Sequence, residues 1–111
     1  MIPQREVKVR LLGEAILQYN ELKSKGDKQS KILLNSIEKI KERLKLNPQY
    51  GDPIRKNMIP KEYKKYGNIY RVELSNFYRL LYTIKGNEVD IFVFILTIVN
   101  HKKYNKKFGY K

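Results

Sequence analysis

The sequence has no cysteine, no tryptophan and a single histidine, His101, among its 111 residues. Without cysteine the chain can form no disulfide, no thiol nucleophile and no cysteine-ligated zinc or iron–sulfur site. The carboxylates are scattered along the chain and only one histidine accompanies them, so no constellation of metal ligands is evident. We therefore expect no metal, no other cofactor and no metal-dependent nuclease chemistry.

Other common signatures are also missing. The chain has no glycine-rich phosphate loop, no Walker motif and no nucleophile elbow. Its first residues contain no apolar signal core, and its longest apolar run, around residue 95, is too short and too β-branched to span a bilayer. We expect a cytoplasmic protein that makes no membrane contact and forms a single domain over residues 1–111.

Acidic residues are scarce. The chain carries 24 Lys and Arg against 11 Asp and Glu, a formal charge of +13. A field of that sign attracts polyanions, most simply nucleic acid or an acidic protein. A lysine-rich thermophile surface is the alternative, but the carboxylates are too few to neutralise the lysines in an ion-pair network, which favours a polyanionic partner.

The first half of the sequence shows one strand pattern and two helix patterns. Residues 6–11 alternate between apolar and charged side chains, which predicts a half-buried strand. Residues 14–25 and 28–46 have apolar positions at helical spacing, and Gly26 and Asp27 separate the two segments. We expect a helical hairpin whose apolar sides cover one face of a sheet.

The second half centres on residues 69–100, where three runs rich in β-branched and aromatic residues predict an antiparallel meander. If residues 75–77 form a three-residue loop, Leu74 pairs with Tyr78 and Glu73 with Arg79, which places Arg71 and Arg79 on one face. A two-residue loop would send the two arginines to opposite faces. The last run is apolar on both sides, with Val93 and Ile95 on one side and Leu96 and Ile98 on the other, so it should lie inside the sheet. The fold class is α+β: an N-terminal strand, a helical hairpin and a three-stranded meander in one sheet, with the helices on one face.

Residues 49–67 are irregular and basic. The candidate RNA-binding side chains in this segment are Arg55, Lys56, Lys61, Lys64 and Lys65. They are interleaved with Tyr50, Tyr63 and Tyr66, a mixture that suits single-stranded nucleic acid because rings stack on bases while ammonium groups meet phosphates. In the alternative interpretation, the tyrosines pack against the edge of the sheet and the lysines are merely solvated.

The C-terminal segment begins with His101, Lys102, Lys103 and Tyr104, directly after the last strand, and Lys102 and Lys103 are further candidate RNA-binding side chains. A lone histidine at a strand end is either a hydrogen-bonded structural residue or a proton carrier. The residue types present permit metal-free RNA cleavage, in which the ribose 2′-hydroxyl attacks its own phosphate. Arginine and lysine then stabilise the charge that develops, and histidine or tyrosine moves protons.

Three strings carry a resemblance to a known family: Tyr70-Arg71-Val72-Glu73-Leu74, Tyr78-Arg79-Leu80-Leu81-Tyr82 and the final His101-Lys102-Lys103-Tyr104. With these strings, the order of the predicted elements resembles the RelE/ParE superfamily of type II toxin–antitoxin toxins. The resemblance covers nearly the whole chain. It implies a ribosome-dependent, metal-independent mRNA endoribonuclease that inhibits translation, with the ribosome, mRNA and a cognate acidic antitoxin as partners.

By the same resemblance, Arg79 corresponds to the arginine that contacts the scissile phosphate, and Arg71 is a basic residue on the preceding strand. His101 and Tyr104 lie in the region that supplies proton-transferring groups. Glu73 departs from the pattern because a second basic residue is usual there, so it is expected either to pair with Arg79 or to act as a general base. The superfamily also contains gyrase-inhibiting members of the ParE type. A non-catalytic, basic nucleic-acid-binding protein of the same fold is a further alternative.

Overall fold

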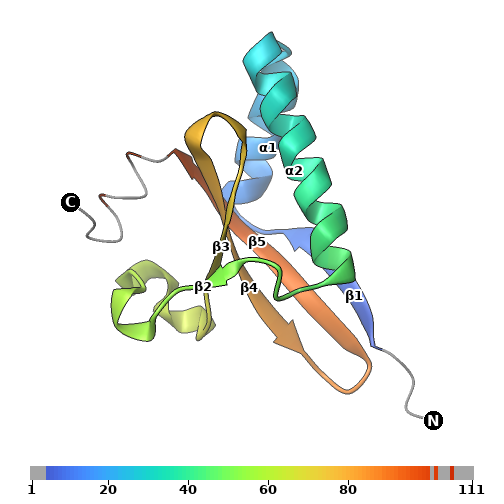
Figure 1. Ribbon diagram of the computed structural model, residues 1–111, viewed down its shortest axis with the longest axis vertical. Helices are drawn as coiled ribbons and strands as arrows, with labels where there is room; N and C mark the ends of the chain where they lie inside the picture. Colours follow the sequence, from blue (N-terminus) through green and yellow to red (C-terminus); the bar gives the residue numbers. More distant parts are fainter. Residues whose placement is uncertain (1–4, 101, 103–105, 107–111) are drawn as a thin grey trace.

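The computed structural model describes residues 5–100, 102 and 106 (Figure 1). The helices are α1 (Glu14–Lys25) and α2 (Lys28–Leu46), and short 3-10 helices are η1 (Lys56–Met58), η2 (Lys61–Tyr66) and η3 (Ser75–Phe77). The strands are β1 (Glu6–Leu11), β2 (Asp52–Pro53), β3 (Tyr70–Glu73), β4 (Tyr78–Gly86) and β5 (Asp90–Asn100).

The five strands form one sheet in the order β1-β5-β4-β3-β2, in which β1 runs parallel to β5 and every other pair is antiparallel. The predicted α+β architecture is therefore confirmed, and β1, α1 and α2 have the predicted bounds. The sequence prediction lacked β2. A two-residue strand that ends in proline shows no alternation by which it could be recognised.

The helical hairpin turns between α1 and α2 because Gly26 can end the first helix and Asp27 can cap the second. Gly26 adopts the left-handed conformation that ends α1, and the Asp27 carboxylate accepts a hydrogen bond from the Ser30 N–H at 3.2 Å to begin α2. Hydrogen bonds from the Ser30 side chain and, to a smaller extent, from its backbone N–H lower the pKa of Asp27 below its usual value. No helix in the described part of the chain is long and apolar enough to cross a membrane.

The sheet separates two apolar clusters. On the helix side, the α2 stripe Leu33, Ile37, Ile40 and Leu44 is buried against residues that include Val72, Leu80, Tyr82, Val93 and Ile95. On the other side, a smaller cluster joins the η1–η2 segment to the sheet through Ile54, Ile59, Tyr63, Ile69, Leu81, Leu96 and Val99. Figure 1 shows the helices and the η1–η2 segment on different sides of the sheet. The sheet face away from the helices is therefore covered in part by residues 54–66.

A β-bulge in β5 corrects one detail of the predicted meander. Leu81 pairs with Thr97 but Tyr82 pairs with Ile95, so Leu96 is the extra residue of β5. The extra residue shifts the alternation, and Ile98 joins Ile95 in the helix-side cluster while Leu96 packs on the other side. Strict alternation had wrongly placed Leu96 and Ile98 on the same face.

The open edge of β5 is closed by a side chain of α1. Pairing between β1 and β5 ends at Leu11 and Ile95. Beyond that point the Gln18 carboxamide takes the place of a strand, because its Nε2 donates to the Ile98 carbonyl at 2.9 Å and its Oε1 accepts from the Ile98 N–H at 2.8 Å. Glu14 accepts a further hydrogen bond from the Thr97 hydroxyl at 2.7 Å. These contacts fix α1 against the C-terminal half of β5.

We expect Gln18→Leu to lower the free energy of unfolding by about 1–3 kcal/mol, because a buried backbone N–H and carbonyl of Ile98 lose both partners. Urea denaturation followed by circular dichroism measures this change. Asn20→Leu on the exposed side of α1 is the matched control, and equal stability of the two variants would contradict the assignment.

Candidate nucleic-acid interface

The β3–β4 hairpin carries the two arginines predicted to contact phosphate. Glu73 pairs with Arg79 and Arg71 with Leu81, and the Leu74 N–H donates to the Tyr78 carbonyl at 2.8 Å. The three-residue loop and its register are therefore confirmed. Arg71, Glu73 and Arg79 share the face of the sheet that points away from the helices.

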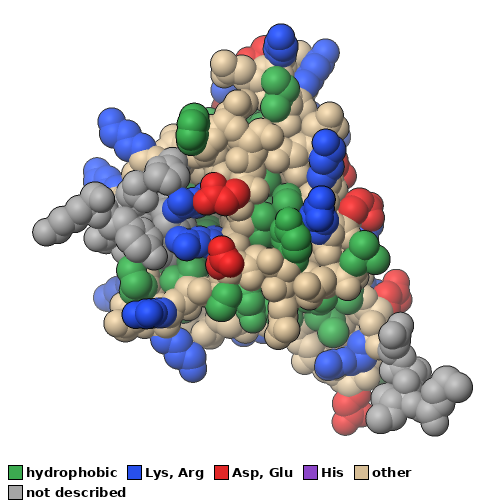
Figure 2. Space-filling model, viewed as in Figure 1, with side chains coloured by type: hydrophobic (Ala, Val, Ile, Leu, Met, Phe, Trp, Pro, Cys, Tyr) green, Lys and Arg blue, Asp and Glu red, His purple; other side chains and the backbone are tan. Residues whose placement is uncertain are grey.

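Each arginine lies beside a carboxylate. Arg79 Nε is 3.0 Å from Glu73 Oε1, and only 12% of the Arg79 side chain is exposed whereas 68% of Glu73 is. Arg71 Nε is 4.0 Å from Asp52 Oδ2, and both of these side chains are more accessible than Arg79. Figure 2 shows acidic side chains next to Lys and Arg side chains in the region where β2 and β3 run in Figure 1. The expected pairing of Glu73 with Arg79 is thus present, and Asp52 is a neighbour that the sequence did not reveal.

Asp52 reaches Arg71 because Gly51 fits closely against β3 and β4. A Cβ at Gly51 would lie 2.6 Å from the Arg71 carbonyl oxygen and 2.9 Å from the Tyr82 hydroxyl oxygen, so a larger residue cannot occupy this position without a shift. The Tyr82 hydroxyl accepts from the Gly51 N–H at 2.9 Å and donates to the Pro48 carbonyl at 2.8 Å. The buried phenol therefore holds the chain that brings β2 alongside β3.

Burial raises the pKa of Tyr82 to about 12, from an ordinary value of 10.0. The ring also stacks on Tyr70, with 5.2 Å between the centroids. Ionisation would place a charge in the core and remove the proton donated to Pro48, so the neutral phenol is the stabilising form.

The basic segment brings two of its predicted residues together. Lys56 of η1 and Lys64 of η2 line a hollow of about 290 Å³, together with Ile59 and Gly67. We call this the lysine hollow. Arg55, Lys61 and Lys65 are exposed around the same segment, and Lys102 is exposed after β5. His101, Lys103 and Tyr104 lie outside the described residues, so their roles stay predictions.

The tyrosines of this segment were predicted either to stack on bases or to pack against the sheet, and they differ in their burial. Tyr63 is buried in the cluster beneath η1 and η2, and Tyr66 is partly buried against it with Lys65 Nζ 5.3 Å from the ring centroid. Tyr50 is exposed, and the Arg43 guanidinium lies 5.4 Å from its ring centroid. Packing against the sheet is therefore the role of Tyr63 and, in part, of Tyr66.

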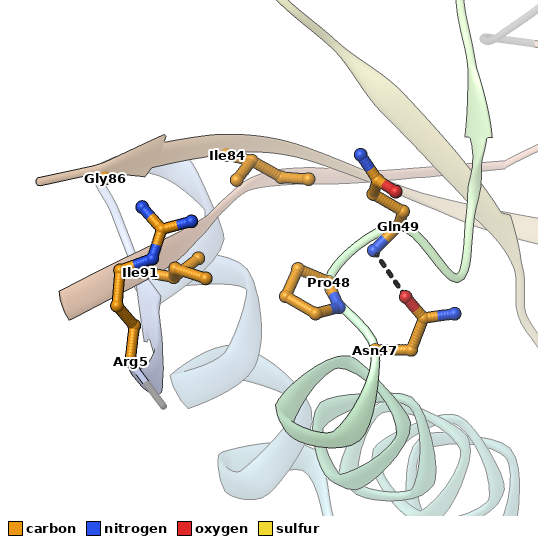
Figure 3. Close-up of a pocket in the computed structure, with 7 residues that line it drawn as sticks. All are labelled: Arg5, Asn47, Pro48, Gln49, Ile84, Gly86 and Ile91. Atoms are coloured by element: carbon orange, nitrogen blue, oxygen red, sulfur yellow. Dashed lines mark hydrogen bonds between the residues drawn. The ribbon is translucent and has the colours of Figure 1, made fainter. Parts of the chain in front are cut away.

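A second hollow, of about 480 Å³, lies near the C-terminal end of α2 (Figure 3). Pro48, Ile84 and Ile91 provide apolar walls, and Arg5 donates a hydrogen bond to the Asn87 carbonyl at 3.0 Å. Among the described residues, none of those predicted to take part in the chemistry lines this hollow, and Arg5 is the only ionisable one that does. The candidate interface is therefore the face that carries Arg71, Arg79 and the lysine hollow.

A comparison with solved structures finds a YoeB/ParE toxin from Agrobacterium tumefaciens. The match covers 85% of this chain and 98% of that toxin, with a TM-score of 0.61 and 12% sequence identity. The chain has the YoeB/ParE toxin fold. Neither a family model nor a curated protein matches the sequence. At this identity the likeness establishes the fold, and it confirms the RelE/ParE-type architecture that the sequence predicted.

The raised pKa of Tyr82 gives a pH-dependent prediction for this toxin fold. The stabilisation from the protonated phenol is complete below pH 10, the unfolded value, and is lost as the pH rises through about 12, the folded value. At neutral pH, Tyr82→Phe should cost about 1–3 kcal/mol because Gly51 N–H and the Pro48 carbonyl lose their partner. The difference in unfolding free energy between wild type and Tyr82→Phe should shrink between pH 10 and pH 12.

Urea denaturation at a series of pH values measures that difference. Tyr50→Phe removes a hydroxyl from an exposed ring and serves as the control, with wild-type stability expected throughout. A difference for Tyr82→Phe that stays constant from pH 8 to pH 12 would show that the phenol is not the titrating group.

Proposed function

We propose that the protein is the toxin of a type II toxin–antitoxin system and that it cleaves mRNA on the ribosome without a metal ion, which arrests translation in the cytoplasm. The observation that carries the proposal is the placement of Arg71 and Arg79 on the sheet face away from the helices. The fold supports it as well, because the match extends over nearly the whole of a YoeB/ParE toxin.

The proposed site residues are of the types that metal-free RNA cleavage requires. The ribose 2′-hydroxyl attacks the adjacent phosphorus, the bond from phosphorus to the 5′-oxygen breaks, and a 2′,3′-cyclic phosphate and a 5′-hydroxyl result. Arg79 and Arg71 stabilise the negative charge that builds on the phosphate oxygens. Glu73 accepts the proton of the 2′-hydroxyl, and His101 or Tyr104 delivers a proton to the leaving 5′-oxygen.

The charge and the fold support the proposed partners. A chain of net charge +13 attracts ribosomal RNA and mRNA through its phosphates. A small acidic antitoxin that covers the face bearing Arg71 and Arg79 would neutralise the toxin until it is removed. A short acidic protein encoded beside this one would support this arrangement.

We expect induced expression of the wild-type protein to halt translation and Arg79→Ala to relieve the arrest, with cleavage reduced by about 10²–10³-fold, the usual effect of removing one charge-stabilising donor. Glu73, left without its arginine, is largely exposed, so the fold should persist. Primer extension on mRNA from a translating extract measures cleavage. Lys39→Ala on the outer side of α2 is the control for loss of one positive charge. Undiminished arrest by a folded Arg79→Ala protein would reject the proposal.

A second prediction concerns Glu73, for which the sequence left two roles open. If Glu73 is the general base, Glu73→Gln should cleave RNA about 10²–10⁴-fold more slowly than the wild type. The rise of cleavage rate with pH that a carboxylate base produces should also disappear. Cleavage on purified translating ribosomes between pH 5 and pH 8 measures both effects. A faster Glu73→Gln variant would instead show that Glu73 only neutralises Arg79.

The same ion pair favours a second candidate, a gyrase-inhibiting toxin of the ParE type that does not cleave RNA. Arg79 is mostly buried and 3.0 Å from Glu73, a geometry that suits a structural arginine as well as a phosphate ligand. Plasmid supercoiling after induction separates the candidates. Relaxed or cleaved plasmid with intact mRNA would establish the second candidate, and intact supercoiling with cleaved mRNA the first.

A further inference from the structure

The lysine hollow lies apart from the two arginines and is built from a different part of the chain. Lys56 and Lys64 come from η1 and η2, and both are exposed while they line the same space of about 290 Å³. Lys85 brings a third ammonium group to the rim, where its Nζ donates to the Tyr66 carbonyl and lies 3.8 Å from the position of a Cβ on Gly67. Gly67 itself has no side chain to fill the rim.

The charges of this hollow differ from those around the arginines. Arg71 and Arg79 each lie beside a carboxylate. Within residues 5–100, 102 and 106, no ion pair involves Lys56 or Lys64. An anion that enters the hollow therefore displaces water and counterions and need not compete with a carboxylate of the described chain.

The walls of the hollow indicate which part of a nucleic acid would enter. Tyr63 is buried, and the ring of Tyr66 is packed against the cluster below with Lys65 beside it. Stacking of a base needs an accessible aromatic face, and none of the described residues that line the hollow (Lys56, Ile59, Lys64 and Gly67) is aromatic. Ammonium groups remain as the recognising groups, and they bind phosphate as point charges without regard to the base.

We propose that the lysine hollow binds the phosphate backbone of single-stranded RNA, independently of the RNA sequence. It would be a second RNA contact in addition to Arg71 and Arg79. The choice of RNA rests on the proposed function. The volume is close to the lower limit of about 300 Å³ for small-molecule sites and suits a sugar-phosphate unit. Arg79 and Lys85 are six residues apart on β4, or about 20 Å, so several nucleotides would span the two sites.

The test is the salt dependence of binding, measured by fluorescence anisotropy with labelled 12-nucleotide oligo(U) and oligo(A). For single strands the slope of log K against log salt changes by about 0.7 for each phosphate contact. We expect Lys56→Gln/Lys64→Gln to reduce the magnitude of the slope by about 1.4, with both oligonucleotides. Lys31→Gln/Lys39→Gln removes the same charge from the exposed side of α2 and should leave the slope within about 0.3 of wild type.

Equal slope losses in the two double variants would overturn the proposal, because they would assign binding to the overall charge. An unchanged slope in Lys56→Gln/Lys64→Gln, or no binding by the wild type, would overturn it as well. A more than tenfold preference for one oligonucleotide would show base recognition and contradict a phosphate-only contact. Arrest of translation is scored separately. A protein that arrests nothing but shows the predicted slope loss would refute the proposed function and leave the lysine hollow as an RNA-phosphate site.

Discussion

The geometry of the candidate interface depends on the closure of one hairpin. The hydrogen bond from Leu74 N–H to the Tyr78 carbonyl fixes the register of β3 against β4, and a slip of one residue would turn Arg71 and Arg79 to opposite faces. The loop adopts this register at a cost, because Asn76 and Phe77 both have positive φ, a conformation that is strained for a bulky residue such as Phe77. Ser36 of α2 accepts a hydrogen bond from the Ser75 N–H at 3.1 Å. The helical hairpin therefore helps to hold the loop that places the arginines.

Positive charge on this protein is of two kinds. The arginines of the sheet are partly buried and lie beside Asp52 and Glu73, since a buried cation without a partner is costly. The lysines of η1 and η2 stay exposed because their segment covers the sheet with apolar residues such as Ile59 and leaves its charged side chains outside. The paired arginines suit a contact with one phosphate at a defined position. The exposed lysines suit attraction of a polyanion along its length.

Much of this fold is encoded by local patterns. The period of the apolar residues in α2, the Gly26-Asp27 corner and the alternation in β1 are each sufficient to predict their elements. What could not be predicted depends on contacts between distant segments. The pairing of β2 with β3 needs the close fit of Gly51 against Tyr82, and the bulge at Leu96 depends on how β5 meets β4. The sequence likewise offered Arg79 and Glu73 as a possible pair, but only the 3.0 Å separation and the burial of Arg79 show how closely the two are held.

The two arginines are not equivalent as phosphate ligands. Glu73 lies 3.0 Å from a guanidinium that has little access to water, whereas Asp52 lies 4.0 Å from a more exposed one. Coulombic attraction rises as the distance and the local dielectric fall, so the Arg79–Glu73 pair is the more strongly held of the two. Exposed pairs at the distance of Arg71 and Asp52 contribute little to stability and exchange easily. An incoming phosphate therefore competes with a weaker partner at Arg71. A phosphate reaches Arg79 Nε only when Glu73 is displaced.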